Sequence, residues 1–460
     1  MLTLIITLIE TVYTFLWGDL ITLPLPGGGT LGLPLLVLLL IPTGLYFTFR
    51  TRFLPLRLFP DMIRATLEKR SHKNGGLSAL QALVVSTATR VGMGNLVGVV
   101  AAISAGGAGA VFWMWVTALI GSSTAFVEAT LAQLYKAKDP LYGGWRGGPA
   151  YYIHKFLAAR RGGKPRRYCI LAVLFAVSGL ICWCGISQVI SNSVASAFQN
   201  AFHIPPLYTT IVLRKNATVK VLDVLVPIMA GCYFFITIFL ILLNIDQLPA
   251  VFERIFAEAF GLRQVVAGGF GAVLMNGVKR GLFSNEAGSG SAPCAAAAAE
   301  SDHAAKVGLM QALGVFIDTI IICSCTAMIM LLAPAEVVDG LTGMDLLQAA
   351  MAYHLGEFGV VFIAAILWLF SFSTFIGILF YARSNVAYLF GDNWLSQTAY
   401  KILALIMLFA GGLATYTFVW DLGDVGVGLM TVFNIAILFP LSGQAMKSLK
   451  DYEQNHRLRR

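Results

Sequence analysis

Long apolar runs, separated by charged residues, prolines and glycine clusters, follow one another along most of the chain. About 20 apolar residues are enough for a helix to cross the hydrocarbon core of a bilayer. Runs of roughly this length fall at residues 31–49, 78–104, 109–134, 169–200, 223–244, 264–295, 307–333, 358–382, 398–418 and 424–446. The pattern therefore predicts an all-α polytopic membrane protein.

The composition agrees, because 58% of the 460 residues are hydrophobic and only 12% are charged, about half the charged share of a soluble domain. The seven cysteines form no CxxC pair and the six histidines form no HxxxH or HExxH pattern. Neither a metal site nor an intramembrane enzyme is indicated. No P-loop points to ATP-driven transport, and no basic run interleaved with aromatics points to nucleic acid. A channel stays open as an alternative, which saturable uptake would exclude.

Basic residues cluster in segments 50–76 and 135–168 and in the tail 447–460, whereas 334–357 and 415–424 carry only acidic charges. Because Lys- and Arg-rich loops stay in the cytoplasm, the first three segments and the C-terminus are expected inside, and the acidic connections outside. The first 17 residues lack the basic start of a signal peptide, so we interpret them as an interfacial or partial helix.

This orientation requires one more span between 169–200 and 223–244, which would leave Arg214, Lys215 and Lys220 inside. The candidate, residues 207–222, begins with seven apolar residues that rise only about 10 Å as a helix. We therefore predict about eleven spans with a truncated fourth core helix, and keep an inactive protein as an alternative. The expected organisation is an N-terminal helix with a basic loop (1–76), a transporter core of two inverted repeats (about 77–222 and 223–446), and the basic tail (447–460).

Two of the runs contain glycines and charges where a plain membrane helix would have neither. The first break lies in 86–95 and the second in 279–293. Glycine-interrupted segments at corresponding places in two halves indicate a transporter site, where freed amides suit a carboxylate and freed carbonyls suit Na⁺.

Several buried polar groups accompany these breaks. Arg90, Arg280 and Glu286 would be costly in a bilayer unless paired, so we predict that Glu286 pairs with Arg90 or Arg280. Glu128 and Asp318 are interpreted as satisfied structural groups, with a role as proton carriers as the alternative. Ser373 and Thr374 either bond back to the preceding helical turn or complete an oxygen cage for Na⁺.

The stretch 106–121 (GGAGAVFWMWVTALIG) resembles the signature of the sodium:alanine (alanine or glycine:cation) symporter family. Segments 90–95, 147–153 and 281–288 also resemble family motifs and follow in family order. The resemblance implies a LeuT-like five-plus-five inverted repeat with one extra N-terminal helix, in the amino acid–polyamine–cation superfamily. It also implies import of alanine or glycine with Na⁺ by alternating access across a bacterial inner membrane. Membrane lipid and a small neutral amino acid are the expected partners, with no nucleic acid and no obligate protein partner.

The family pattern also implies site residues. The substrate would contact Gly92, Met93, Gly94, Asn95, Gln188, Ser284, Asn285, Gly288 and Ile378. Na⁺ would contact the carbonyls of Ala88 and Val91 and the hydroxyls of Ser373 and Thr374. Three positions depart from the pattern: many relatives have Thr at Met93, often Trp at Ile378, and commonly Leu at Ser289. The smaller Ile378 predicts room for a larger substrate side chain.

Overall fold

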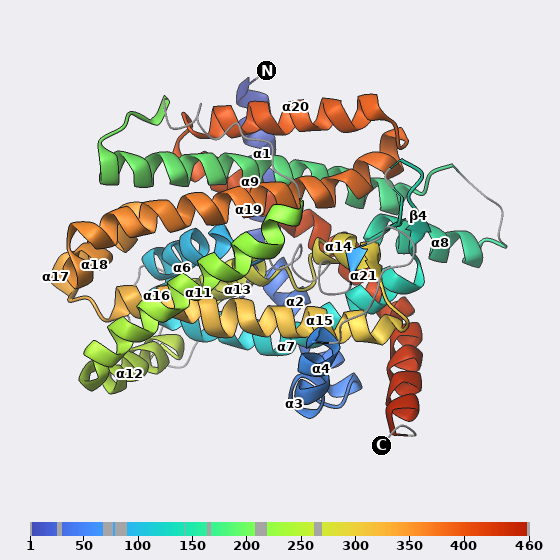
Figure 1. Cartoon of the computed structure of the whole chain (residues 1–460), viewed down its shortest axis with the longest axis horizontal. Helices are drawn as coiled ribbons and strands as arrows, with labels where there is room; N and C mark the ends of the chain where they lie inside the picture. Colours follow the sequence, from blue (N-terminus) through green and yellow to red (C-terminus); the bar gives the residue numbers. More distant parts are fainter. Residues whose placement is uncertain are drawn as a thin grey trace.

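The computed structural model of the chain describes residues 2–24, 30–67, 77–78, 90–141, 143–162, 167–207, 219–261 and 269–457. This part of the chain is a bundle of helices with three short two-stranded sheets (Figure 1). Ala88 and most of segment 207–222 lie outside these described residues. The all-α prediction is confirmed, and the proposed truncation of a fourth core helix stays a prediction.

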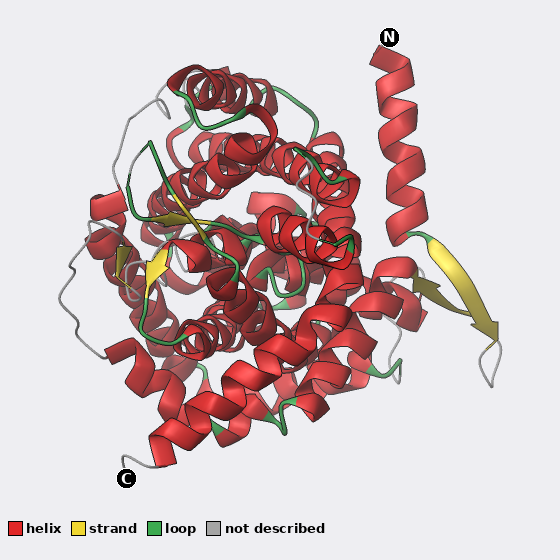
Figure 2. Ribbon diagram, turned by 90° about the vertical axis from the view of Figure 1, so that its right-hand side faces the viewer, coloured by secondary structure: helices red, strands yellow, loops and turns green. Residues whose placement is uncertain are grey.

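The N-terminal helix and the hairpin that follows it lie beside the bundle (Figure 2). Helix α1 confirms the predicted helix over residues 2–17, and it is followed by an antiparallel hairpin, a short apolar helix and two small helices. These are α1 (Leu2–Trp17), β1 (Asp19–Pro24), β2 (Thr30–Pro34), α2 (Leu35–Arg50), α3 (Leu54–Arg57) and α4 (Phe59–Leu67). Helix α1 packs against α21 and α2, and the Trp17 indole donates a 3.1 Å hydrogen bond to the Asp424 carbonyl.

The next elements begin with a broken helix and continue through two long helices joined by a polar hairpin. Its elements are β3 (Leu77–Ser78), η1 (Gly94–Gly98), α6 (Val99–Gly106), α7 (Gly109–Leu134), β4 (Ala137–Lys138), β5 (Trp145–Arg146), α8 (Pro149–Arg160), α9 (Ile170–Phe202), α11 (Val219–Leu243), η2 (Ile245–Gln247) and α12 (Leu248–Ala259). Helix α6 ends at Gly106 because Gly107 takes a positive φ of 68°, which glycine adopts without a Cβ clash.

From α13 onward the chain again has a broken helix followed by long helices. Its elements are α13 (Gly269–Asn285), α14 (Ala292–Ala298), β6 (Ala299–Glu300), α15 (Ala304–Val315), η3 (Phe316–Cys323), α16 (Ser324–Leu331), α17 (Ala335–Val338), α18 (Gly343–Leu355), α19 (Glu357–Phe390), α20 (Trp394–Gly411) and α21 (Tyr416–Arg457). Strand β6 pairs in parallel with β3, so the chain leaving the second broken helix lies beside the chain approaching the first. Helices α9, α19 and α20 run side by side along the long axis (Figure 1).

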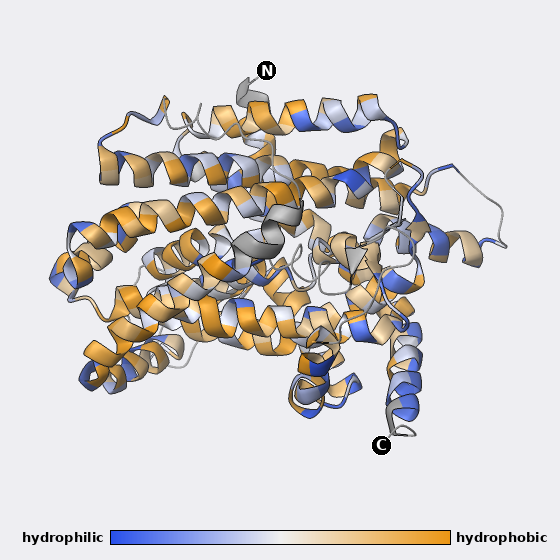
Figure 3. Ribbon diagram, in the orientation of Figure 1, coloured by the Kyte–Doolittle hydropathy of each residue, from blue (hydrophilic) through white to orange (hydrophobic). Residues whose placement is uncertain are grey.

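Six described helices are long and apolar enough to cross a membrane, or seven if the pair Pro227–Leu243 and Ile245–Ala259, bent by 77°, is one span. The six are Gly109–Leu134, Ile170–Phe202, Ala304–Leu331, Glu357–Phe390, Trp394–Gly411 and Phe418–Asn455. Hydrophobic residues make up most of these helices, and hydrophilic residues gather around β4 and α8 and on the last turns of α21 (Figure 3). The count is below eleven partly because the two broken helices and α2 are too short to qualify by length.

The predicted outer connection at 415–424 is wrong. Helix α21 already begins at Tyr416 and runs for 42 residues, so Asp421 and Asp424 lie within it. Asp424 is fully buried but does not end the helix, because the cations of Lys279 and Arg280 lie against its carboxylate.

Candidate functional site between the two broken helices

Both predicted helix breaks are present. Helix α13 stops at Asn285 and α14 starts at Ala292; between them Glu286, Gly288 and Gly290 have φ values of 57°, 96° and 82°. These left-handed conformations interrupt the α-helical ladder. In the first segment the helical geometry is lost at residues 91–92 and resumes in the π-helix η1.

The two broken helices meet at a buried polar cluster centred on Asp318. The amide of Asn95 donates to Asp318 Oδ1 at 2.7 Å, and the Ser284 hydroxyl donates to Asp318 Oδ2 at 2.9 Å. The Thr319 hydroxyl donates to the same Oδ2 at 2.7 Å. The backbones approach closely here, since a Cβ built on Gly94 would lie 3.4 Å from Ser284 Cα. Asn95 and Ser284 were predicted at the site, and the structure brings them together.

Asn95 and Asp318 share a second feature, because each lies in a π-helix. Asn95 belongs to η1 and Asp318 to η3. A π-turn inserts an extra residue into the helical ladder and is found frequently at functional sites. Nothing in the apolar run around Asp318 signals this distortion, so the contact of Asp318 with the broken helices was missed from the sequence.

The first break also lies against α19, as the predicted Na⁺ ligands require. The backbone N–H of Met93 donates to Thr374 Oγ1 at 3.1 Å. The hydroxyls of Ser373 and Thr374 also bond back to the Phe370 carbonyl, at 2.8 Å each. Hydrogen bonds from Ser373 and Thr374 back to the preceding turn are therefore compatible with a position of these hydroxyls beside the first break. Val91 is buried at the break, and Ile378, one turn beyond Thr374, lies on the same face of α19.

Three buried carboxylates interact electrostatically with the same arginine, Arg90. Arg90 donates from Nη1 to the backbone and side-chain oxygens of Gln311, at 3.1 Å each. It also interacts electrostatically with Glu128, Glu286 and Asp318. No ion pair within 4.0 Å joins Arg90 to Glu286 in the described part of the chain. Residues 79–89 carry no charged side chain, so the groups around Arg90 include more negative than positive charges.

The predicted pair between Arg280 and Glu286 is wrong. Arg280 instead makes a bidentate pair with Asp424 on α21, with N–O distances of 3.0 and 2.9 Å, and stacks 3.9 Å over the Trp420 ring. Lys279 lies 3.3 Å from the same carboxylate. Glu286 instead has a side-chain hydrogen bond with Tyr381. Arg280 lies on α13 and faces α21, whereas Glu286 lies just beyond the end of α13.

Glu128 on α7 is a satisfied group, as the sequence interpretation proposed. Its Oε2 accepts a 3.1 Å hydrogen bond from the Gly288 N–H, and its Oε1 accepts one from the Asn434 amide. Asn434 also donates to the Gly288 carbonyl at 3.0 Å and accepts from the Tyr152 hydroxyl. Glu128 and Asn434 thus hold both backbone polar groups of one unwound residue, Gly288. No sequence pattern indicated this role for Asn434 or Tyr152.

Two predicted substrate residues contact other parts of the protein. Gln188 donates to the Met407 sulfur on α20 at 3.8 Å. Asn285 lines a cavity of about 20 Å³ together with residues of α2, α7 and α21, and its Oδ1 caps the Ala287 N–H. The structure therefore does not bring these two amides to Asn95 and Ser284.

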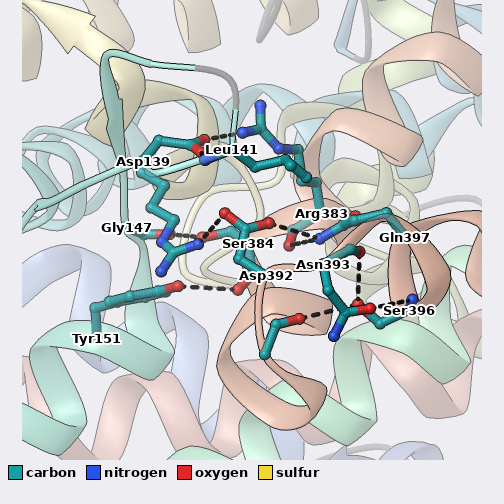
Figure 4. Close-up of polar contacts among 12 residues, drawn as sticks. Asp139, Leu141, Gly147, Tyr151, Arg383, Ser384, Asp392, Asn393, Ser396 and Gln397 are labelled. Atoms are coloured by element: carbon teal, nitrogen blue, oxygen red, sulfur yellow. Dashed lines mark hydrogen bonds and ion pairs between the residues drawn. The ribbon is translucent and has the colours of Figure 1, made fainter.

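A second polar network joins the β4–β5 hairpin and α8 to the end of α19 and the start of α20 (Figure 4). Arg383 pairs with Asp139, and Arg146 pairs with Asp392. Tyr151 donates to the Ser384 carbonyl at 3.3 Å, and Gln397 donates to Asp392 at 3.4 Å. The sequence shows Asp139 only as a lone acid in a basic segment, because its partner lies 244 residues away.

Comparisons with known proteins agree with this architecture. The chain is 42% identical over 431 residues to the amino-acid carrier protein AlsT of Bacillus subtilis, covering 91% of this chain and 89% of the relative. It is 36% identical to the sodium/proton-dependent alanine carrier protein of Bacillus sp. (85% and 92% covered). It is 33% identical to the sodium/alanine symporter AgcS of Methanococcus maripaludis (98% and 97% covered).

The fold also matches solved transporters. The crystal structure of MhsT in complex with L-phenylalanine aligns with a TM-score of 0.54 at 14% identity, covering 82% of this chain and 89% of that one. MhsT has the LeuT fold, so the structural likeness supports that architecture. The sequence pattern of the sodium:alanine symporter family matches residues 27–460. The protein is therefore an integral membrane transporter rather than an enzyme, and it belongs to the sodium:alanine symporter family.

Proposed function

We propose that this protein imports alanine or glycine together with Na⁺ across the bacterial cytoplasmic membrane by alternating access. The observation that carries the proposal is the meeting of both broken helices, through Asn95 and Ser284, at the buried carboxylate of Asp318. A small amino acid bound at this junction would contact both halves of the protein at once. Relative movement of the two halves would then expose it to one side or the other.

The Asp318 cluster is our first candidate for the coupling ion. A carboxylate, two hydroxyls and an amide are oxygen donors of the kind that hard cations prefer. The negative surplus around Arg90 adds to this argument, because a bound cation would offset it. In the Na⁺-bound protein we expect Asp318, Ser284, Thr319 and Asn95 to turn oxygens toward the ion in place of the hydrogen bonds they make to one another.

The second candidate ion site is the neutral one implied by the family resemblance. It combines the carbonyls of Ala88 and Val91 with the hydroxyls of Ser373 and Thr374. The Met93–Thr374 hydrogen bond supports it, since it holds the first break directly against these hydroxyls. We assign the substrate to Gly92, Met93, Gly94, Asn95, Ser284 and Ile378 around the same break.

Proton coupling is the alternative, and one observation favours a specific carrier. Both carboxylate oxygens of Glu128 and of Asp318 accept hydrogen bonds. Glu286 is buried, yet its Oε2 has no hydrogen-bond partner among the residues that the structure describes. Glu286 is therefore a better candidate proton carrier than either carboxylate singled out in the sequence.

Labelled L-alanine uptake into proteoliposomes tests these proposals. We expect accumulation under an inward Na⁺ gradient and none when K⁺ replaces Na⁺. Accumulation driven by a pH gradient alone would support proton coupling instead. Absence of uptake of alanine, glycine and serine by correctly inserted protein would overturn the proposed function and favour an inactive family member.

A further inference from the structure

A basic pocket lies outside the transport site, where α2 turns into α3 beside the last turns of α21. It has a volume of about 290 Å³, and its charged lining residues are Arg50, Arg52, Arg57, Lys450 and Glu453. The pocket therefore has four cationic side chains and one acidic side chain. An excess of three positive charges in one concave site suits an anion rather than a neutral ligand.

The acidic side chain is already neutralised within the protein. Arg57 Nη1 lies 2.7 Å from Glu453 Oε1. The same guanidinium donates to the carbonyls of Arg52 (3.2 Å) and Thr51 (3.1 Å), so its position is fixed. Arg50, Arg52 and Lys450 make no side-chain hydrogen bond or ion pair with any described residue. Three cations thus line the pocket without an ion-pair partner among the described residues.

The backbone at the pocket is held in a conformation that ordinary residues avoid. Arg52 and Phe53 have φ values of 56° and 55°, the left-handed region where a Cβ clashes with the backbone. The turn is fixed by hydrogen bonds from the Phe53 N–H to the Thr48 carbonyl (2.8 Å) and from the Arg52 N–H to the Phe49 carbonyl (3.0 Å). Two adjacent non-glycine residues kept in this region indicate that the surrounding structure specifies this turn.

Large apolar side chains are exposed next to the pocket. Phe49, Phe53 and Leu56 are 63%, 47% and 73% exposed, and the Phe49 and Phe53 rings pack together with centroids 5.2 Å apart. In a membrane protein such side chains face acyl chains. Helix α2 ends at Arg50, so the basic pocket and this apolar surface are adjacent at the end of an apolar helix.

We propose that this pocket binds the headgroup of an anionic phospholipid, with the phosphate among Arg50, Arg52 and Lys450 and the acyl chains along Phe49, Phe53 and Leu56. Basic pockets between helices on the cytoplasmic side are suited to such headgroups. A free phosphate would use the cations only, whereas a phospholipid uses both features. The bound lipid links α2 and α3 to α21.

The test is thermal unfolding of the purified full chain titrated with phosphatidylglycerol, phosphatidylcholine or inorganic phosphate. The pocket variant is Arg50→Gln/Arg52→Gln/Lys450→Gln. The matched control, Lys138→Gln/Arg160→Gln/Arg161→Gln, removes three exposed cations near β4 and α8. Each variant is compared with its own melting temperature without lipid. The single variant Lys450→Gln serves if the triple variant does not fold.

We expect phosphatidylglycerol to raise the melting temperature of the native protein and of the control at similar concentrations. Each pocket cation removed should raise the required concentration about five-fold, so Lys450→Gln alone should give a clear shift. Equal responses of the pocket and control variants would overturn the proposal. Equal protection of the native protein by phosphatidylcholine would also overturn it, and equal protection by inorganic phosphate would assign the pocket to a soluble anion instead.

Discussion

Asp318 and Glu128 are both fully buried carboxylates that contact the second broken helix, but they are held by different kinds of partner. Asp318 accepts hydrogen bonds from the side chains of Asn95, Ser284 and Thr319. Glu128 accepts one from the backbone of Gly288 and one from the Asn434 side chain, which itself holds the Gly288 carbonyl. Two carboxylates of similar burial thus have different structural contexts.

This difference in partners distinguishes a carboxylate that can bind an ion from one that supports the unwound helix. Hydroxyl and amide side chains can rotate to share Asp318 with an incoming cation while the backbone stays in place. Glu128 can be released only if the unwound peptide at Gly288 moves, because an unsatisfied buried N–H is costly. The comparison therefore assigns ion binding to Asp318 and maintenance of the unwound helix to Glu128.

The largest effect should come from Asp318→Asn. This change keeps the shape of the side chain but removes the charge that attracts the cation. We expect Na⁺-driven alanine uptake to fall about a hundred-fold, on the basis of roughly 3 kcal/mol for an interaction with a charged group. The melting temperature should change little. Uptake and Na⁺ dependence equal to those of the native protein would remove Asp318 from the ion site.

Glu128→Ala should mainly lower the stability of the folded protein. It leaves the Gly288 N–H and one N–H of the Asn434 amide without their acceptor, at a cost of about 2–3 kcal/mol. Thermal unfolding in detergent should show a clearly lower melting temperature, and hydrogen exchange should show faster exchange around residues 286–291. A native melting temperature combined with complete loss of uptake would instead give Glu128 a direct role in transport.

Thr374→Val tests the second candidate ion site. Valine has nearly the shape of threonine but lacks the hydroxyl that accepts the Met93 hydrogen bond. We expect the Na⁺ concentration for half-maximal uptake to rise about ten-fold, with roughly 1–2 kcal/mol lost, while the folded protein stays stable. An unchanged Na⁺ requirement would leave the Asp318 cluster as the only candidate of the two.

The smallest effect is expected for Tyr152→Phe. The Tyr152 hydroxyl reaches Glu128 only through Asn434, so its loss should cost about 1 kcal/mol of stability. The melting temperature should drop slightly and Na⁺-driven uptake should stay near the native rate. A larger loss of uptake than that of Asp318→Asn would contradict the division between the two carboxylates.

The sequence predicts features that depend on neighbouring residues. The positions of the long helices follow from apolar runs, and both helix breaks follow from glycines and charges inside them. Long-range pairs were not predictable in the same way. Asp424 was assigned to a loop because an acid in an apolar run indicates a boundary when its partner is unknown, and that partner, Arg280, lies 144 residues away.

The contrast between local patterns and long-range contacts also explains which site residues were predicted and which were missed. Asn95 and Ser284 were implied by the family resemblance, whose motifs include the broken segments in which they lie. Asp318 and Asn434 lie 223 and 306 residues from Asn95 and Glu128, their respective partners. Their contacts arise from the packing of separate helices, and no local pattern in the chain records them.

The most direct test of cation coupling at the Asp318 cluster is alanine-driven uptake of radioactive sodium into proteoliposomes, measured in parallel for the native protein and Asp318→Asn. We predict that external alanine increases sodium uptake by the native protein and leaves sodium uptake by the variant unchanged. Alanine uptake by the native protein without sodium uptake, or equal alanine-driven sodium uptake by both proteins, would contradict this account.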